Sequence, residues 1–215
     1  MNPKNPIKIM LVDDHAVVRA GVRRLLEQET HFSVVAECDS GERAYQMFGD
    51  VNPDITIMDL SMPGMGGMEA INRILTRYPQ AKLLVLSMHE NAVFASQALK
   101  IGERGYVAKT GLAEELVIAL ERIANGQTYM NEHLTKKIAL QIVNSDAHVL
   151  QQLSAREFEI FRLLAEGQDV LNIGKLLNIS AKTAANYQTS IKQKLGINNS
   201  VEMVRLALRC GLIDT

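Results

Sequence analysis

The chain has 215 residues, 47% of them hydrophobic and 22% charged, with a formal net charge of −1. This size allows one large or two modest globular domains with sizeable cores. No apolar stretch approaches the roughly 18 residues of a membrane span, and acidic residues come too early for a signal peptide. We therefore expect a cytoplasmic protein with no membrane partner.

Cysteine use and charge distribution further limit the classes of protein to which the chain can belong. Cys38 and Cys210 are far apart in the chain and lack metal-ligand spacing, so we expect buried or idle thiols rather than a disulfide or a zinc site. Residues 1–152 hold 15 Lys+Arg against 18 Asp+Glu, whereas residues 153–215 hold 8 against 6. A mildly basic second part permits nucleic-acid binding but does not by itself demonstrate it.

Strand-like and helix-like runs alternate in the first part of the chain, up to Asn125. Short apolar runs closed by turn residues indicate buried strands, and runs with the helical period indicate amphipathic helices. Five such pairs predict a parallel sheet with helices on both faces. The expected strands are 7–12, 34–38, 55–58, 83–87 and 106–107, and the expected helices are 17–28, 42–48, 68–78, 92–100 and 113–124.

Three carboxylates follow strands of this sheet. Asp13 and Asp14 come directly after the first strand, and Asp59 comes after the third. The carboxyl ends of parallel strands meet at the edge where such sheets place their ligands. An isolated Asp after a strand is usually a helix cap. Three acidic groups at neighbouring strand ends repel one another unless a cation lies among them, which predicts a hard divalent ion such as Mg²⁺.

A hydroxyl and an ammonium group belong to the same edge. Ser87 ends the fourth strand and Lys109 follows the fifth. A carboxylate beside Mg²⁺ can act as nucleophile toward a phosphoryl group, which would form an aspartyl phosphate on Asp59. The metal and Lys109 would offset the charge of the phosphoryl oxygens, and Ser87 would donate a hydrogen bond to one of them. Most serines and lysines at a surface have no such role, and only the coincidence of all five groups supports it.

These residues belong to four stretches that resemble the receiver domain of bacterial two-component response regulators. The stretches are Val12-Asp13-Asp14-His15, Met58-Asp59-Leu60-Ser61-Met62-Pro63-Gly64, Leu86-Ser87 and Gly105-Tyr106-Val107-Ala108-Lys109. The resemblance implies a flavodoxin-like α/β fold with a five-stranded parallel sheet. It also implies that a sensor histidine kinase phosphorylates Asp59, that Asp13 and Asp14 hold Mg²⁺ with the backbone carbonyl of Ser61, and that Lys109 contacts the phosphoryl group.

The resemblance further implies that Ser87 and Tyr106 form a switch pair. Ser87 would move toward the phosphoryl group and Tyr106 would turn inward, which would bias the face around the fourth helix. One departure concerns Thr110, because many receivers have proline after the lysine, often with a cis bond. The geometry of the Lys109–Thr110 peptide is therefore left open.

The segment 126–150 differs in character from the first part. Gly126 ends the fifth helix, and the apolar residues between 134 and 143 allow a short amphipathic helix. Residues 144–148 read as a tether. The alternative is a sixth helix packed on the sheet domain. Either interpretation places a boundary near Gln151 and divides the chain into 1–125, 126–150 and 151–215.

The last part, 151–215, has the pattern of a small helical domain. Ser154 and Glu157 have capping-box spacing at the start of a helix. A second helix is expected over about 170–177, a third from Ser180, its cap, through Leu195, and a last one over 200–209. Helix, short turn and helix is the DNA-binding arrangement in which the later helix enters the major groove.

Five residues of the third helix are candidates for contact with double-stranded DNA. Ala185, Asn186 and Thr189 share one side at helical spacing. Asn186 could pair with adenine and Ala185 could touch a thymine methyl, while Lys182 and Lys192 could meet phosphates. The alternative is a helix face that is merely solvated.

This part also resembles a known domain, the LuxR-type helix-turn-helix. The resemblance is carried by Leu153-Ser154-Ala155-Arg156-Glu157, Leu164-Ala165-Glu166-Gly167, Ser180-Ala181-Lys182-Thr183 and Ile191-Lys192-Gln193-Lys194-Leu195-Gly196. A LuxR-type helix-turn-helix joined to a receiver domain is the arrangement of the NarL/FixJ family of response regulators, and the chain resembles that family along nearly its whole length. In this family the unphosphorylated receiver commonly covers the DNA-reading helix, and phosphorylation favours release and a homodimer.

The helical part departs from the family pattern in two places. The chain has Leu171-Asn172-Ile173-Gly174 where Lys-Glu-Ile-Ala is usual, and Ala184-Ala185 where Val-Lys is usual. These changes remove charged side chains and add a helix glycine that costs about 1 kcal/mol. We expect weaker contacts to DNA phosphates and a less stable helical domain.

These patterns together predict a phosphorylation-controlled, DNA-binding transcription regulator rather than an enzyme. One alternative is a receiver whose degenerate output domain binds protein. Another is a phosphatase that turns over an aspartyl phosphate. The sequence speaks against a phosphatase, which needs a further acid or base near the nucleophile, and no residue is placed convincingly for that role. His89, two residues after Ser87, could influence hydrolysis.

Overall fold

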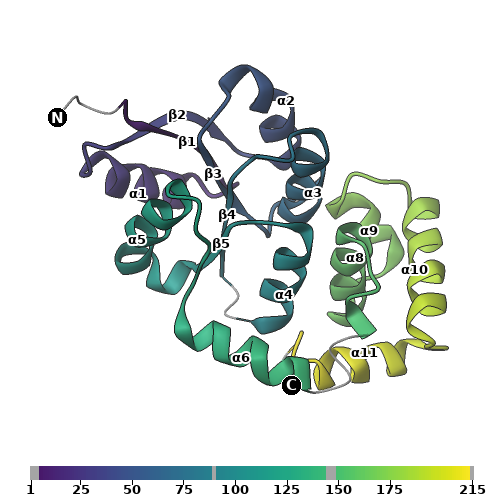
Figure 1. Cartoon of the computed structure of the whole chain (residues 1–215). Coiled ribbons are helices and arrows are strands. Elements are labelled where there is room, and N and C mark those ends of the chain that lie inside the picture. Colours follow the sequence, from purple (N-terminus) through teal and green to yellow (C-terminus); the bar gives the residue numbers. More distant parts are fainter. Residues whose placement is uncertain (1–4, 89–90, 144–148, 214–215) are drawn as a thin grey trace. The chain divides into compact units, whose positions relative to one another are not determined.

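The computed structural model describes residues 5–88, 91–143 and 149–213, and it divides into two compact units (Figure 1). The sheet unit comprises Met1–Glu90 and Ile101–Asn131, and the helical unit comprises Asn91–Lys100 and Glu132–Thr215. His89 and the expected tether 144–148 lie outside the described residues. In the part of the chain that is described, no helix is both long enough and apolar enough to cross a membrane.

The sheet unit is built on six parallel strands in the order β2-β1-β3-β4-β5-β6. They are β1 Ile7–Val12, β2 Phe32–Cys38, β3 Ile55–Asp59, β4 Leu83–Ser87, β5 Gly105–Ala108 and β6 Tyr129–Met130. The expected parallel sheet is confirmed, but five strands were too few. The sixth strand has two residues, and such a short run carries no readable alternation.

Two pairs of helices cover the sheet, α1 and α5 on one face and α2 and α3 on the other (Figure 1). Their bounds are α1 Ala16–Glu27, α2 Gly41–Val51, α3 Gly67–Arg77 and α5 Leu112–Ala124. Val22 and Leu26 of α1 join Leu116 and Leu120 of α5 in one core cluster against the strands. Strands β3 and β4 are buried at every residue, as expected for a sheet covered on both faces.

The strand register aligns the carboxyl ends of four strands. Val12 pairs with Met58, so Asp13 and Asp59 are the next residues of adjacent strands. On the other side of β3, Asp59 pairs with Leu86, and Ser87 pairs with Ala108 just before Lys109. The predicted site residues therefore converge at one edge of the sheet.

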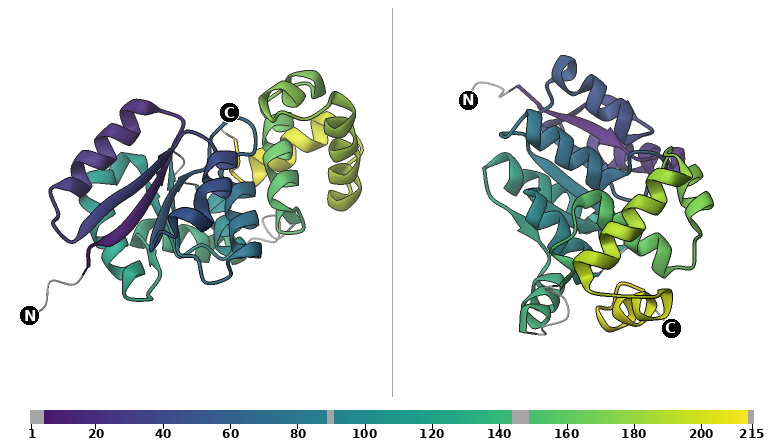
Figure 2. Two further views of the ribbon diagram at one scale, coloured as in Figure 1. Left: turned by 90° about the horizontal axis from the view of Figure 1, so that it is seen from above. Right: turned by 90° about the vertical axis from the view of Figure 1, so that its right-hand side faces the viewer.

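The helical unit comprises α4 Ala92–Ile101, α6 Glu132–Val143, α8 Ala155–Ala165, α9 Val170–Leu176, α10 Ala181–Leu195 and α11 Ser200–Arg209. Phe158 and Phe161 of α8, Ile173 of α9, Ile191 of α10 and Met203 of α11 are buried. The right-hand view of Figure 2 shows α10 as a long straight helix, and Figure 1 shows α11 running at an angle to it. The expected helix-turn-helix is present.

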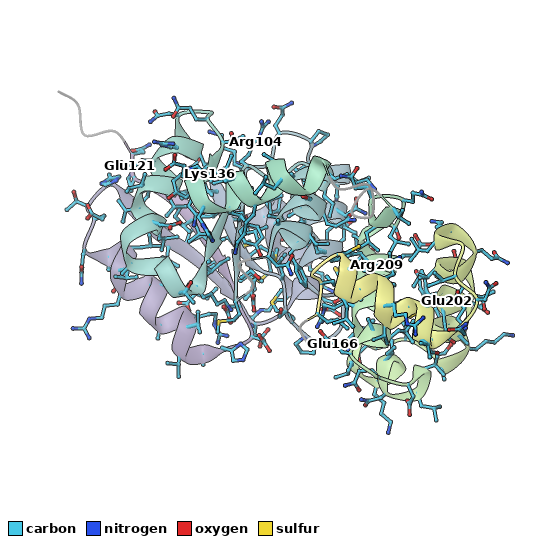
Figure 3. The ribbon with its side chains drawn as sticks, turned by 90° about the horizontal axis from the view of Figure 1, so that it is seen from below. Arg104, Glu121, Lys136, Glu166, Glu202 and Arg209 are labelled. Atoms are coloured by element: carbon cyan, nitrogen blue, oxygen red, sulfur yellow. The ribbon has the colours of Figure 1, made fainter. Side chains whose placement is uncertain are left out.

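Polar side chains define where these helices begin. The capping box predicted at Ser154 forms, because its hydroxyl accepts from the Glu157 amide while the Glu157 carboxylate accepts from the Ser154 amide. Ser180 caps α10 by accepting from the Thr183 amide at 3.0 Å. Asn199 and Glu202 close the start of α11, where Glu202 is labelled in Figure 3. Caps of this kind satisfy amides that would otherwise lack partners.

Helix α6 confirms the predicted helix after the fifth βα pair, and it groups with the helical unit. Its Leu134 is buried and its Leu140 is 69% exposed. Helix α4 was expected inside the sheet domain, but it also groups with the helical unit.

Candidate functional site

The acidic cluster lies at the carboxyl edge of β1 and β3. One ligand atom each from Asp13, Asp14, His15 and Asp59 lies within 4.8 Å of every other. The Asp13 and Asp59 side chains are almost completely buried, whereas Asp14 is half-buried. His15 contacts Asp14 at 2.9 Å and Asp13 at 3.3 Å. The prediction did not include His15 as a possible ligand, although it directly follows the two carboxylates.

Lys109 supplies the cation on the other side of the cluster. It begins a short 3₁₀ turn directly after β5. Its Nζ lies 2.7 Å from Asp13 Oδ2 and 3.0 Å from Asp59 Oδ2, and its side chain is only 7% exposed. The peptide bond to Thr110 is trans, which answers the question left open by the missing proline.

Burial and neighbouring charges shift the pKa values of the ionisable groups of this site in opposite directions. Burial raises the pKa of Asp59, and the ammonium of Lys109 offsets part of that rise. Burial lowers the pKa of Lys109, but the hydrogen bond to Asp13 and the charge of Asp59 outweigh it, so that the net shift is upward. The charged form of Lys109 and the charged form of Asp59 therefore stabilise each other.

The residues of the cluster fit a divalent cation. One buried oxygen each of Asp13, Asp14 and Asp59 accepts no hydrogen bond within the described chain and meets only the ammonium of Lys109 or the ring of His15. Three carboxylates and one ammonium leave two negative charges uncompensated. Carboxylate oxygens are the ligands that Mg²⁺ takes in proteins. Asp13, Asp14 and Asp59 are therefore the residues that would hold it.

Three further predicted residues lie in this region with different exposure. The Ser61 amide donates to Asp59 Oδ1 at 3.3 Å, and the Ser61 side chain is exposed. Ser87 and Tyr106 are both completely buried. The inward turn of Tyr106 on phosphorylation stays a prediction.

Gly67 is a residue that sequence reasoning missed as part of the site. A β-carbon at this position would lie 1.9 Å from the backbone oxygen of Asp59. The Gly67 amide also donates to the Leu60 carbonyl at 3.1 Å. The loop after β3 can fold back on Asp59 only because residue 67 has no side chain. The sequence showed a Gly-Gly break here but not what it approaches.

The DNA-contact candidates of α10 are arranged as one stripe. Lys182, Asn186 and Thr189 are exposed, and Ala185 and Lys192 are half-exposed. Thr189 also donates to the Ala185 carbonyl at 3.1 Å within the helix. The exposed stripe continues to Gln193 at the same helical spacing, and the prediction omitted it.

The departures from the family pattern fall on different surfaces. Leu171 is 63% exposed and Asn172 is exposed, whereas Ala184 is completely buried. A side chain at position 184 thus packs in the core and makes no phosphate contact. A β-carbon on Gly174 would lie 2.9 Å from the Ile179 carbonyl, so this glycine gives the turn of the helix-turn-helix room to pack closely.

Comparison with known families assigns both parts of the chain. Residues 9–121 match the response regulator receiver domain, and residues 151–207 match the bacterial regulatory proteins of the luxR family. The two matches cover the acidic site and the whole helix-turn-helix.

Curated relatives match along nearly the whole length. The response regulator UvrY of Escherichia coli is 35% identical over 210 residues, covering 97% of this chain and 96% of UvrY. The response regulator GacA of Pseudomonas aeruginosa is 34% identical over 210 residues, covering 97% and 98%. The transcriptional regulatory protein DegU of Brevibacillus brevis is 33% identical over 227 residues, covering 98% and 96%.

Solved structures agree with this assignment. RcsB of Salmonella enterica serovar Typhimurium, bound to a promoter in the presence of a phosphomimetic, is similar with a TM-score of 0.71 and 31% identity, over 94% of this chain and 98% of that one. A LuxR-family two-component response regulator from Aurantimonas has a TM-score of 0.62 and 40% identity, over 65% of this chain and all of that one. The chain belongs to the NarL/FixJ family of response regulators, in which a receiver domain is joined to a LuxR-type helix-turn-helix.

Proposed function

We propose that this protein is a DNA-binding transcription regulator controlled by phosphorylation of Asp59 by a sensor histidine kinase. The observation that carries the proposal is the buried carboxylate of Asp59, 3.0 Å from the Lys109 ammonium and beside Asp13 and Asp14. A structural ion pair needs one carboxylate for one lysine. The excess of carboxylates suits a site that receives both a cation and a phosphoryl group.

Each residue of the site has its own role in the proposed phosphoryl transfer. A carboxylate oxygen of Asp59 attacks phosphorus while the bond from phosphorus to the donor's histidine nitrogen breaks, and the electron pair of that bond leaves with the nitrogen. Asp13, Asp14 and Asp59 would hold Mg²⁺, which would supply positive charge to the phosphoryl oxygens. Lys109 transfers its contacts from the carboxylates to one of those oxygens, and Ser87 donates to another.

The output is proposed to be DNA binding by a phosphorylated homodimer, with a receiver over 1–125, a linker over 126–150 and the DNA-binding domain over 151–215. Solved RcsB structures include a complex with DNA and one in which two dimers bind two parallel DNAs. In this chain, Lys182, Asn186 and Thr189 form an exposed polar stripe on α10. Base contacts by such a stripe would give sequence preference, and Lys182 and Lys192 would meet phosphates.

A second candidate, an output domain that binds protein, is favoured by one observation. Leu171 is 63% exposed on α9, where a basic side chain would reach a phosphate. Leu171 also has no charge to contribute to counterion release, which supplies much of the affinity for DNA. The experiment below distinguishes the two candidates.

The test begins with selection of bound sequences from random duplex DNA by the protein treated with a small phosphodonor and Mg²⁺. Affinity for the selected duplex is then measured for the unchanged protein and for Asp59→Asn, each with and without phosphodonor. We expect the phosphodonor to tighten binding by the unchanged protein about tenfold or more, and to leave Asp59→Asn unaffected.

A matched pair of substitutions identifies the DNA-reading face. Asn186→Ala on the stripe should weaken binding by about 1–3 kcal/mol, whereas Asn198→Ala in the exposed loop before α11 should leave it unchanged. If no duplex is bound in either phosphorylation state, the protein-binding candidate replaces the DNA-binding one.

A further inference from the structure

The turn between β1 and α1 carries Asp13 and Asp14, so its shape sets the positions of two of the three carboxylates of the acidic cluster. The Asp13 amide donates to the Cys38 carbonyl at the end of β2, at 3.1 Å. The Asp13 carboxylate accepts from the His15 amide at 2.8 Å and contacts Lys109. Both of these groups are therefore engaged, and the carbonyl is the remaining polar group of Asp13.

Arg19 holds that carbonyl. It is the fourth residue of α1, and its Nη1 donates to the Asp13 carbonyl oxygen at 2.5 Å in a half-buried position. A hydrogen bond from a charged donor is shorter and stronger than one between neutral groups. The bond therefore ties the start of α1 firmly to the turn that precedes it.

The held oxygen belongs to the peptide unit that joins Asp13 to Asp14. Because a peptide unit is planar, fixing its oxygen also fixes the direction in which the chain continues to the Asp14 α-carbon. The Asp13 side chain is completely buried, whereas the Asp14 side chain is only half-buried and meets His15, which is itself exposed. Asp14 is thus the least restrained of the three carboxylates within the described chain, and Arg19 acts on the peptide from which it projects.

Glu37 of β2 braces the guanidinium of Arg19 from the other side. Arg19 Nε lies 3.9 Å from Glu37 Oε2, and Glu37 Oε1 accepts from Arg23 Nη1 at 2.5 Å. Arg23 also pairs with Glu27 at 2.7 Å. The Arg19 side chain is 19% exposed, compared with 48% for Arg23. Because partly buried charges are screened less than exposed ones, the contacts of Arg19 keep more of their strength than the surface pairs of Arg23.

The charges of this group cancel. Arg19 and Arg23 balance Glu27 and Glu37, so the group does not offset the negative charge left on the acidic cluster. A positive charge close to a cation site opposes binding of the cation. If Arg19 acted by its charge alone, it would weaken the binding of Mg²⁺. Any favourable contribution of Arg19 must therefore come from the position in which it holds the turn.

We propose that Arg19 is a positioning residue of the metal site, which fixes the Asp13–Asp14 peptide in the arrangement that receives Mg²⁺. This inference rests on the proposed binding of Mg²⁺ by Asp13, Asp14 and Asp59. Mg²⁺ demands nearly ideal octahedral geometry, so a displaced Asp14 costs affinity. Residues that orient metal ligands without touching the metal change metal affinity about 10-fold to 100-fold when they are replaced.

The test titrates the full-length protein with Mg²⁺ alone, without phosphodonor, and measures the dissociation constant by isothermal titration calorimetry. Arg19→Met removes the donor and keeps a long side chain. Arg24→Met is the matched control, because Arg24 carries the same charge on the same helix but is exposed in its last turn. Asp13→Asn identifies the metal site itself. Circular dichroism confirms that each variant is folded.

We expect Arg19→Met to raise the dissociation constant for Mg²⁺ about tenfold or more, and Arg24→Met to leave it unchanged. Arg19→Lys keeps the charge but replaces the planar fork of donors by a point charge. Its dissociation constant should lie between those of the unchanged protein and Arg19→Met. Amide exchange over 14–16 should become faster in Arg19→Met before any Mg²⁺ is added, because the turn opens more often.

Two results contradict different claims. If Asp13→Asn abolishes Mg²⁺ binding but Arg19→Met binds as tightly as the unchanged protein or more tightly, Arg19 does not position the turn and the metal site stands. If the unchanged protein does not bind Mg²⁺, or Asp13→Asn binds it equally well, the metal site is wrong and the inference about Arg19 falls with it. Should Arg19→Met fail to fold, Arg19→Lys decides, and an unchanged dissociation constant in that variant would contradict the proposal.

Discussion

At the scale of single residues, the central feature is a group of buried carboxylates with too few positive partners. Lys109 pairs with both Asp13 and Asp59, and Asp14 contacts only His15 among the cationic groups of the described chain. An isolated ion pair in such a place would be costly, since desolvation can exceed the Coulombic gain. The proposed divalent cation and phosphoryl group would supply the positive charge and the hydrogen-bond acceptors that the arrangement lacks.

Glu103 is a buried carboxyl group outside the acidic cluster, and no cationic side chain of the described residues pairs with it. Its side chain is 3% exposed, and neither oxygen accepts a hydrogen bond from another residue within the described chain. Burial raises its pKa from 4.5 to about 8. Because the folded state holds the proton more tightly, the stability associated with this group is complete below about pH 4.5 and is lost as the pH rises through about 8.

We expect Glu103→Gln to remove this loss of folding stability at rising pH. The free energy of unfolding of the unchanged protein should fall between about pH 5 and about pH 8, by up to about 5 kcal/mol for the full pKa shift, and the variant should show a much flatter profile. Urea unfolding at several pH values measures both. Asp50→Asn, which changes an exposed carboxyl on α2, is the control and should keep the steep profile. Parallel profiles for all three proteins would show that Glu103 is not the responsible group.

At the scale of elements, one carboxylate connects the start of α8 to α10. Glu157 of α8 accepts from the Ser154 amide, from the Ser190 hydroxyl and from Lys194 of α10 at 2.6 Å. Burial alone would raise its pKa, but the bonds from Lys194, Ser154 and Ser190 outweigh it and lower the pKa to about 2. Its stabilising effect is therefore present above about pH 4.5 and is lost as the pH falls toward about 2.

We expect Glu157→Ala to lower the free energy of unfolding of the helical unit by about 2 kcal/mol, because it removes a helix cap together with an ion pair in which the carboxylate is buried and Lys194 is exposed. The control is Glu166→Ala, which removes only the surface pair with Arg162 at the end of α8 and should cost less than about 0.5 kcal/mol. Glu166 is labelled in Figure 3. Urea unfolding followed by far-ultraviolet circular dichroism gives both values, and equal losses in the two variants would contradict the account of Glu157.

Elements with a clear period could be predicted from the sequence to within a few residues. Strands β1 and β4 and helix α11 have the expected bounds. Strand β6 escaped prediction because two residues carry no period, and the grouping of α4 escaped because a helix that is apolar nearly all round does not indicate its neighbours. Asp13, Asp59 and Lys109 could be placed together because parallel strands share an edge. Gly67 could not, since its role depends on a backbone approach that only the fold reveals.

At the scale of the whole molecule, the two family matches describe a chain whose input and output are different parts of one sequence. The receiver match ends at residue 121 and the luxR-family match begins at residue 151. Helix α4 lies within the receiver match by sequence, yet it groups with the output helices by contact.

The most direct test of the central claim is the intact mass of the protein after incubation with a small phosphodonor, with Mg²⁺ or with a chelator. The unchanged protein is predicted to gain the mass of one phosphoryl group only when Mg²⁺ is present, and Asp59→Asn is predicted to gain none. Equal labelling of Asp59→Asn, or full labelling in the chelator, would contradict the assignment of Asp59 as the metal-assisted phosphoryl acceptor.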